Sequence, residues 1–211
     1  MVASCQLYLV RHGLTLWNKE KRYLGHTDLT LLEEGKETLS LLKVALAEIK
    51  WSRMYCSDLR RCIETAEYLF PAQLNKMIRT PLLRELHFGL WEGKTYEELK
   101  EDQTYRLWLD DQTRFSPPQG ESSEQFEKRV KLFLDQLFQE MENGENMLLC
   151  THGGVIRHIL TFLQPSSSFW DWNVLHGTAY RVELVRKGGS WTCGSLSVVP
   201  MQENEELFKK E

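Results

Sequence analysis

The chain has 211 residues, of which 42% are hydrophobic and 27% are charged, a composition typical of a globular protein. Its net charge of −4 argues against a protein that binds nucleic acid or an anionic membrane surface, because both require a basic face. No apolar run approaches the ~18 residues of a membrane span, and the first ten residues lack the basic flank and the apolar core of a signal peptide.

The first part of the chain pairs a strand with a helix. The apolar run 6–10 predicts a buried strand that ends abruptly at Arg11. Apolar residues at helical spacing predict a helix over 33–49. Thr30 and Glu33 have the spacing of a capping box for that helix.

The next segments repeat this alternation. Residues 54–56 predict a short strand, and Ser57 is expected to be the N-cap of a helix that runs to about Leu69. Residues 92–115 are polar and are predicted to be helical in part. Strands that alternate with helices favour a sheet with parallel strands.

The longest predicted helix follows. Ser122 and Gln125 form a second capping-box pattern at its start, and Gly144 is expected at the C′ position beyond its end. Residues 147–150 predict another buried strand, and a helix is predicted from 155 to 163.

In the C-terminal part of the chain, apolar residues recur at every second position, as in a strand. Apolar and polar residues alternate over 179–185, and a glycine pair then predicts a turn. Residues 190–199 are predicted to form a second strand that pairs with the first, so this part of the chain is expected to be a hairpin. The polar residues 202–211 are expected to fray. We therefore predict a single domain over 1–211, a three-layer α/β/α sandwich with a largely parallel sheet and a C-terminal β-hairpin.

Five cysteines, an odd number without a CxxC pair, argue against a disulfide framework or a zinc site: Cys5, Cys56, Cys62, Cys150 and Cys193. We expect reduced and mostly buried thiols, as in a cytoplasmic protein. Cys150 lies inside a predicted strand, where a small buried hydrophobic role is expected rather than a reactive thiol.

Two histidine motifs each follow the carboxyl end of a predicted strand. They are Arg11-His12-Gly13 and Thr151-His152-Gly153-Gly154. Ligands bind at this edge of an open α/β sheet. The glycines let backbone N–H groups approach an anion closely, and the helix after His152 offers its positive end. We therefore expect both histidines at one anion-binding edge.

Two further motifs add charge to this edge. Ser57 to Arg61 supplies an arginine at another junction between a strand and a helix, and Arg84-Glu85 supplies a carboxylate. Two arginines, two histidines and one glutamate suit a phosphoryl group, because the planar fork of arginine matches phosphate oxygens in pairs. We interpret Arg60 as a surface residue and Glu92 as structural.

These four motifs resemble those of the histidine phosphatase superfamily, also called phosphoglycerate-mutase-like. The resemblance is carried by residues 9–18 (LVRHGLTLWN), 57–66 (SDLRRCIETA), 84–93 (RELHFGLWEG) and 151–154 (THGG), in the order and at the spacing of that family. It extends from about Gln6 to Val199. One RHG motif alone would be weak, but four linked motifs are specific.

The resemblance implies a catalytic role for five residues. His12 is the expected nucleophile that forms a phosphohistidine, and a backbone carbonyl must then hold its other N–H to fix the tautomer. Arg11, Arg61 and His152 are expected to hold the phosphoryl oxygens. Glu85 is expected to protonate the leaving oxygen and later to take a proton from water. No metal and no cofactor are implied.

Further residues are candidates for substrate binding. Asn18, Gly25 and Gly153 match positions near the phosphate in members of the family. His26 is expected either at the pocket rim or in a plain surface role. Arg157 either reaches the substrate from the helix after His152 or lies on the surface. The expected partner is a small-molecule phosphate ester, and both a monomer and a homodimer remain open.

The charge of residues 92–111 bears on the substrate. Phosphoglycerate mutases of this family have a longer chain with an insertion that carries an Arg-Arg pair for a second anionic group. Here the segment holds seven acidic and three basic residues, a local charge of −4. It would repel a second anionic group unless its acids point outward. We therefore favour hydrolysis of a monophosphate over mutase chemistry.

The segment of about 88–121 is also rich in aromatic residues. It is expected to form an apolar lid over the phosphate site, and the alternative is that its rings only attach the insert to the domain. Its sequence is most similar to the α-ribazole-5′-phosphate phosphatase branch, which acts in cobalamin nucleotide-loop assembly. A broad-specificity phosphatase, a mutase and a non-catalytic phosphate-binding domain remain as alternatives.

Overall fold

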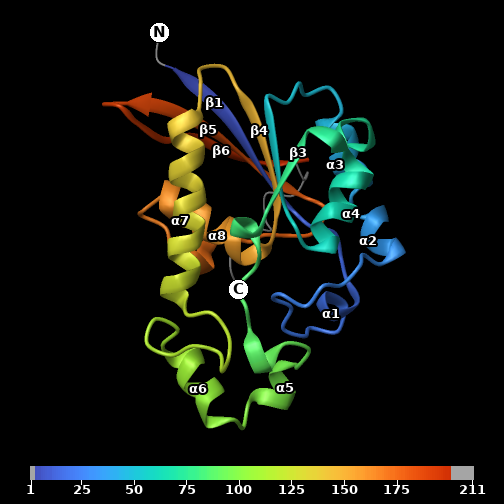
Figure 1. Cartoon of the computed structure of the whole chain (residues 1–211), viewed down its shortest axis with the longest axis vertical. Coiled ribbons are helices and arrows are strands. Elements are labelled where there is room, and N and C mark those ends of the chain that lie inside the picture. Colours follow the sequence, from blue (N-terminus) through green and yellow to red (C-terminus); the bar gives the residue numbers. More distant parts are fainter. Residues whose placement is uncertain (1–2, 201–211) are drawn as a thin grey trace.

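The computed structural model describes residues 3–200. Within this range, the strands form one mixed sheet in the order β3-β2-β4-β1-β5-β6 (Figure 1). Their bounds are β1 Ser4–Arg11, β2 Arg53–Ser57, β3 Met77–Thr80, β4 Asn146–Thr151, β5 Ala179–Lys187 and β6 Ser190–Val199. Strands β1 to β4 run parallel, and β5 and β6 form an antiparallel hairpin beside β1. The predicted sheet and hairpin are confirmed.

Helices cover both faces of this sheet. The α-helices are α1 Leu16–Lys19, α2 Glu33–Glu37, α3 Ser40–Leu46, α4 Arg60–Leu69, α5 Tyr96–Leu99, α6 Gln103–Asp110, α7 Ser123–Glu140 and α8 Gly153–Leu163. Short 3-10 helices are η1 Pro71–Lys76, η2 Pro81–Leu83, η3 Gly89–Trp91 and η4 Phe169–Asp171. Figure 1 shows α3 and α4 on one side and α7 and α8 on the other, so the three-layer prediction is also confirmed.

The alternation of side chains along β1 divides the core in two. Leu7 and Leu9 pack with the apolar residues of α7 and α8, whereas Tyr8 and Val10 pack with those of α3 and α4. Burial of each such aliphatic side chain contributes about 1.5–3 kcal/mol. Packing on both faces holds β1 and β4 in register. The positions of the residues that directly follow these two strands are therefore fixed relative to each other.

The predicted helix over 33–49 is broken in the structure. It forms α2 and α3, and the hydroxyl of Thr38 donates to the carbonyl of Gly35 at 2.9 Å, where it competes with the helical ladder. The predicted capping box of Thr30 and Glu33 is wrong, because the N-cap is Leu32 and no side chain caps this end. The capping box of Ser122 at the start of α7 is confirmed.

Two other predicted helix ends are wrong. Ser57 is not an N-cap, because α4 begins at Arg60 after the extended residue Leu59. Ser57 is instead the fully buried last residue of β2. Helix α7 ends at Glu140, so Gly144, with φ +83°, belongs to the following turn and is not at C′.

Helices α5 and α6 belong to the segment of about 88–121, which lies beyond the carboxyl ends of the parallel strands (Figure 1). Trp91, Tyr105 and Trp108 are buried in a cluster of their own, against Tyr23 and Phe88. The hydroxyl groups of Tyr23 and Tyr105 are 2.6 Å apart. Part of the aromatic content therefore attaches the insert to the domain, as the alternative interpretation held.

The remaining sequence expectations have mixed outcomes. All five cysteines lie in the described range as free thiols, and all except Cys193 are buried, as expected. The expected fraying of 202–211 falls outside the described residues. None of the helices within residues 3–200 is long and apolar enough to span a membrane.

Candidate functional site

The pairing of β1 with β4 brings the two histidine motifs together. Arg11 pairs with Thr151 at the carboxyl ends of these strands, and the N–H of His12 bonds to the carbonyl of Thr151 at 3.0 Å. The rings of His12 and His152 consequently lie 5.1 Å apart between centroids. The predicted convergence at one sheet edge is what the structure shows.

His12 is held in one tautomer. Its Nδ1–H donates to the carbonyl of Gly13 at 2.7 Å, which leaves the lone pair on Nε2. The ring is buried, and burial together with the positive charges of Arg61 and Arg11 lowers its pKa well below the ordinary value. His12 is therefore a neutral imidazole at pH 7 with Nε2 available. The amide of Gly13 is itself fixed by the hydroxyl of Thr65 at 2.9 Å.

Arg61 is fully buried at the start of α4 and is held by backbone carbonyls. Its Nη1 donates to the carbonyl of Thr27 at 2.9 Å, and its Nη2 donates to the carbonyl of Gly25 at 2.6 Å. Burial lowers its pKa from the ordinary value. A Cβ atom at position 25 would lie 2.3 Å from the carbonyl oxygen of Leu86, so only glycine fits there.

His152 has both ring nitrogens occupied. Nδ1 accepts from Nε of Arg61 at 3.2 Å, so the proton must be on Nε2, which donates to Oγ of Ser57 at 2.9 Å. Burial and the neighbouring Arg61 charge lower its pKa well below the ordinary value. The motif of Ser57 was expected to supply only Arg61, but the structure shows that it also orients His152.

Arg11 reaches across the edge of the sheet. Its Nη1 donates to the carbonyl of Val174 at 2.6 Å, whereas its Nε is buried and has no hydrogen-bond partner in the described part of the chain. Burial lowers its pKa to about 10, which leaves it charged at pH 7. Gly153 lies directly beside this guanidinium, since a Cβ there would be 3.5 Å from Cζ of Arg11.

Glu85 is placed at the same edge by two backbone amides. Its Oε2 accepts from Gly154 and its Oε1 from Leu86, both at 2.9 Å. A Cβ at position 154 would lie 2.3 Å from the Glu85 carboxylate, so the second glycine of the motif makes room for it. His26 bonds from Nε2 to the carbonyl of Glu85 at 3.0 Å and so supports that backbone.

Beside Glu85 lies an aromatic hollow of about 300 Å³. Its aromatic side chains are Tyr23, Phe88, Trp108, Phe126, Phe169 and Trp170. Arg157 also lines it, with its guanidinium about 5.7 Å from the ring centre of Phe169 and its Nε bonded to the carbonyl of Trp172 at 3.1 Å. Arg157 is therefore at the hollow and not on a remote surface.

A second, basic hollow of about 280 Å³ touches the other side of the site. Arg11, Asn18 and His176 line its inner part. Oδ1 of Asn18 also accepts from the backbone N–H of Thr15 at 3.3 Å, which closes the capping box of α1.

His176 is a site residue that the sequence interpretation missed. Its Nδ1 donates to the carbonyl of His12 at 2.8 Å, and the two rings are 5.4 Å apart. It lies in the turn just before β5, which pairs antiparallel with β1 so that Ala179 faces Val10. Because β5 is antiparallel to β1, it starts beside the end of β1, where His12 lies. The predicted hairpin after residue 179 was therefore the signal that could have located His176.

Arg60 and Glu92 have the non-catalytic positions that the sequence predicted for them. The side chain of Arg60 is 63% exposed and pairs with Glu64. Glu92 accepts from the backbone N–H groups of His26 at 2.7 Å and Thr27 at 2.6 Å, so its role is to hold this loop. Within residues 3–200, no group of three metal-binding side chains is positioned to hold an ion.

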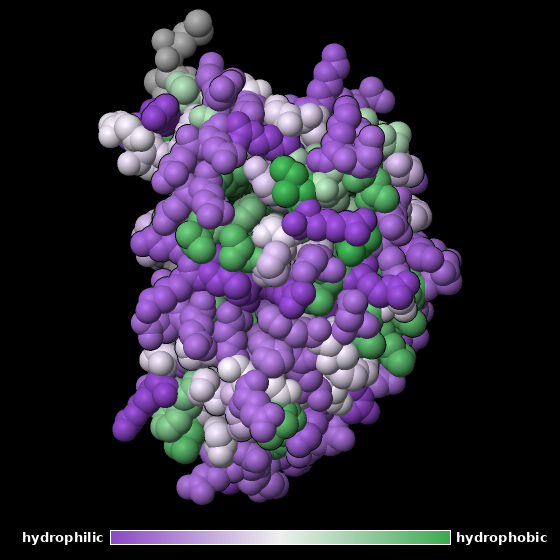
Figure 2. All heavy atoms as spheres, viewed as in Figure 1, coloured by the Kyte–Doolittle hydropathy of each residue, from purple (hydrophilic) through white to green (hydrophobic). Residues whose placement is uncertain are grey.

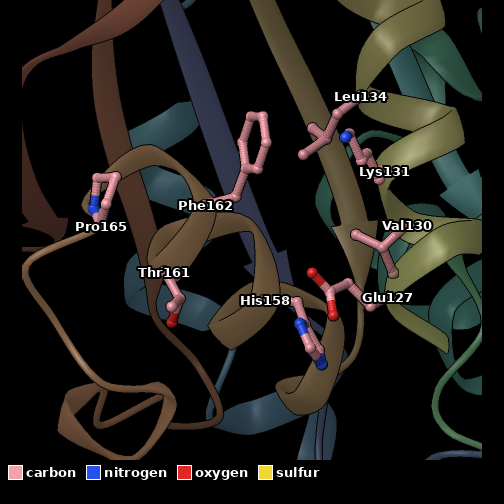
Figure 3. A pocket seen from close by; sticks show the side chains of 8 residues that line it. All are labelled: Glu127, Val130, Lys131, Leu134, His158, Thr161, Phe162 and Pro165. Atoms are coloured by element: carbon pink, nitrogen blue, oxygen red, sulfur yellow. The ribbon is translucent and has the colours of Figure 1, made fainter. Parts of the chain in front are cut away.

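A third hollow, of about 410 Å³, lies between α7 and α8. Figure 3 shows the side chains that line it: Glu127, Val130, Lys131, Leu134, His158, Thr161, Phe162 and Pro165. It contains none of the predicted site residues and shares only His158 with the aromatic hollow. The surface on this side is mostly hydrophilic, with apolar side chains in small separate groups (Figure 2).

The fold and the site together define an α/β protein that gathers two arginines and two histidines at the carboxyl ends of its parallel strands, the edge at which such sheets bind ligands. The family model described as histidine phosphatase superfamily (branch 1) matches residues 7–198. The chain therefore belongs to the histidine phosphatase superfamily, as its four motifs had indicated.

Individual relatives carry more than one kind of name. An adenosylcobalamin/alpha-ribazole phosphatase of Salmonella typhimurium is 30% identical over 183 residues, which cover 85% of this chain and 90% of that protein. Phosphoglycerate mutase-like protein 4 of Arabidopsis thaliana is 31% identical, over 90% of this chain and 84% of that protein. The crystal structure of the alpha-ribazole phosphatase from Shigella flexneri matches with a TM-score of 0.80 at 28% identity, over 90% of this chain and 95% of that chain.

Proposed function

We propose that the protein is a phosphomonoesterase that works through a phosphohistidine on Nε2 of His12. The observation that carries this proposal is the hydrogen bond from Nδ1 of His12 to the carbonyl of Gly13, which directs the lone pair of a neutral imidazole to Nε2. In the first step Nε2 forms a bond to phosphorus, and the bond from phosphorus to the ester oxygen breaks.

The positive charge around His12 supports this chemistry. Arg61, which is buried, and Arg11, which is half-buried, are charged and adjacent to the nucleophile, and Nε of Arg11 is a buried donor without a partner among residues 3–200. A buried unsatisfied donor is costly, and a phosphoryl oxygen would satisfy it. In the proposed mechanism Arg11, Arg61 and His152 stabilise the charge that spreads over the phosphoryl oxygens in the transition state.

Glu85 is the proposed general acid and base. Its carboxyl group lies where the site opens into the aromatic hollow, so it faces the side on which the leaving group must depart. It gives a proton to the leaving oxygen in the first step. In the second step it takes a proton from water while the new P–O bond replaces the bond to His12, which releases inorganic phosphate.

The aromatic hollow favours a leaving group with a flat ring. Faces and edges of aromatic side chains stack on aromatic bases, and the hollow adjoins the proposed acid Glu85. We therefore propose α-ribazole-5′-phosphate, the ester of a riboside of an aromatic base, as the best candidate substrate. The names of the Salmonella and Shigella relatives support this choice. The hydrolysis would take place in the cytoplasm, where free thiols persist.

Two other functions remain as candidates. The mutase-like name of the Arabidopsis relative supports phosphoglycerate mutase chemistry, and the presence of two different hollows at one site supports a phosphatase of broad specificity. A non-catalytic phosphate-binding domain is the least favoured, because all five proposed catalytic residues are present and gathered.

The decisive experiment is a panel of phosphate esters compared by kcat/KM, with α-ribazole-5′-phosphate, an aryl phosphate and both phosphoglycerates. Hydrolysis is expected, and His12→Ala should lower turnover by roughly a thousandfold or more. The control histidine variant is His87→Asn, because the His87 side chain is 39% exposed and lines neither hollow at the site. Full turnover by His12→Ala would reject the proposal. Interconversion of 2- and 3-phosphoglycerate with the bisphosphate present would instead identify a mutase.

A further inference from the structure

The basic hollow beside Arg11 has an outer part that the proposed reaction does not use. Lys21 and Arg22 line this part, together with the ring of Tyr96. No carboxylate lines the hollow. Tyr23 lines both this hollow and the aromatic one, so the two adjoin.

The two outer cations differ in how far their charges are compensated. Arg22 donates from Nε to Glu20 at 2.6 Å and from Nη1 to Glu98 at 3.0 Å and to the carbonyl of Gly93 at 2.6 Å. Its charge is thus shared between two carboxylates. Lys21 has an exposed side chain with no ion-pair partner among residues 3–200. The ammonium group of Lys21 is therefore available to an anion from solution.

The backbone places Lys21 at a position where glycine is favoured. The N–H of Lys21 bonds to the carbonyl of Asn18 at 3.2 Å, and the N–H of Arg22 bonds to the carbonyl of Trp17 at 2.8 Å. These two bonds form a Schellman motif that closes α1. They hold Lys21 at φ +56°, a left-handed conformation that costs a lysine more than a glycine. A lysine is not needed to end this helix.

The acids of residues 92–111 do not oppose an anion here. Glu97 pairs with Lys100, Glu101 pairs with Arg106, and Glu98 pairs with Arg22. Asp102 caps α6 and Glu92 holds the neighbouring loop. None of the seven acids lines either hollow at the site. All of them are exposed except Glu92, whose carboxylate is held by the backbone N–H groups of His26 and Thr27. In this arrangement the negative charge of the segment no longer argues against a second anionic group.

We propose that Lys21 is a specificity-determining residue that binds a second anionic group of the substrate, a carboxylate or a phosphate, in the basic hollow. This inference rests on the proposed phosphomonoesterase activity and names a substrate class for it: small phosphate esters with a second negative charge within reach of the scissile phosphate. The aromatic hollow takes uncharged ring-bearing leaving groups, and the basic hollow takes anionic ones.

The test compares matched esters. 3-Phosphoglycerate and glycerol 3-phosphate have the same carbon skeleton and differ in a carboxylate, and fructose 1,6-bisphosphate and fructose 6-phosphate differ in a phosphate. For each pair we take the kcat/KM of the ester with the second anionic group divided by the kcat/KM of the ester without it. We expect Lys21→Ala to lower this ratio about fivefold in at least one pair, mainly through a higher KM for the ester with the second anionic group. Lys131→Ala is the matched control, because Lys131 is an exposed lysine that lines the separate hollow of Figure 3.

A second variant separates specificity from folding. Lys21→Gly removes the ammonium group and relieves the left-handed backbone, so it should show the same fall in the ratio with a Tm equal to or above that of the parent protein. Ratios that stay constant in both variants, or that fall equally in Lys131→Ala, would overturn the inference. Hydrolysis of p-nitrophenyl phosphate is measured alongside. If the parent protein fails there, the proposed function is at fault and not only the role of Lys21.

Discussion

Ser57 and His152 meet at the carboxyl ends of two neighbouring strands, with Oγ of Ser57 2.9 Å from Nε2 of His152. Both side chains are fully buried. Arg61 donates to the other nitrogen of the same ring, so the serine and the arginine together determine the tautomer and the plane of His152. A residue expected to start a helix is thus the one that positions a proposed catalytic histidine.

Replacement of this serine should affect activity more than the fold. Ser57→Ala leaves the buried Nε2–H without its oxygen partner, which costs about 1–3 kcal/mol. We expect kcat on an aryl phosphate to fall about tenfold with a small change in KM, because the ring loses its orientation. Ser52→Ala, an exposed serine near the other end of the same strand, is the control. An unaltered kcat in Ser57→Ala would show that the hydrogen bond does not position His152.

The role of Glu85 predicts a dependence on the leaving group. An alkoxide leaving group needs a proton, whereas a nitrophenolate leaves without one. Glu85→Gln should therefore lower kcat/KM for an alkyl phosphate by roughly 100-fold or more and for p-nitrophenyl phosphate much less. The control is Glu92→Gln, which should reduce Tm through its lost backbone contacts and should affect both esters alike. Equal losses on the two esters in Glu85→Gln would remove it from the proton transfer.

Buried neutral histidines predict a loss of stability in acid. Burial, followed by the charge of Arg11, lowers the pKa of His176 to about 4, whereas an unfolded histidine titrates near ~6.5. Between these values the unfolded chain binds a proton that the folded chain excludes, so the free energy of unfolding falls as pH decreases from about 7 toward 4. Each such group contributes at most ~1.4 kcal/mol per pH unit.

Urea unfolding at pH 7, 6 and 5 measures this dependence. The pKa values of His12 and His152 are lowered in the same direction, so the parent protein should lose stability in this range. His176→Asn removes one of these groups and should give a shallower decline with pH. The same slope in both proteins would contradict the assignment of His176 as a buried neutral residue.

The aromatic residues are expected to divide into two functional groups. Trp170 is 58% exposed and lines the aromatic hollow, so Trp170→Ala should raise KM for α-ribazole-5′-phosphate several-fold relative to glycerol 3-phosphate. Trp91 is only 2% exposed, packs in the aromatic cluster and does not line the hollow. Trp91→Ala should therefore cost about 3–5 kcal/mol of stability, read from urea unfolding. A loss of stability without any change in substrate preference in Trp170→Ala would contradict this division.

The family and the fold class were predictable from the sequence, and so was the convergence of the two histidine motifs at one edge of the sheet. Apolar runs that stop at Arg11 and at Thr151 indicate buried strands, and the carboxyl ends of parallel strands share one edge of a sheet. Residues that directly follow such strands, including His12 and His152, are carried to the site by the backbone itself. Their convergence needs no knowledge of side-chain packing.

Tertiary structure alone decided the contacts whose partners are far apart in sequence. Ser57 has the local pattern of a helix cap, yet it turns inward because His152, 95 residues away, offers a buried N–H. His176 reaches His12 because β5 runs antiparallel to β1. The acids of residues 92–111 are exposed except for Glu92, and none of them lines the hollow that contains Lys21. Sequence patterns report on neighbours within about one helical turn, whereas the direction of a side chain depends on what packs against it.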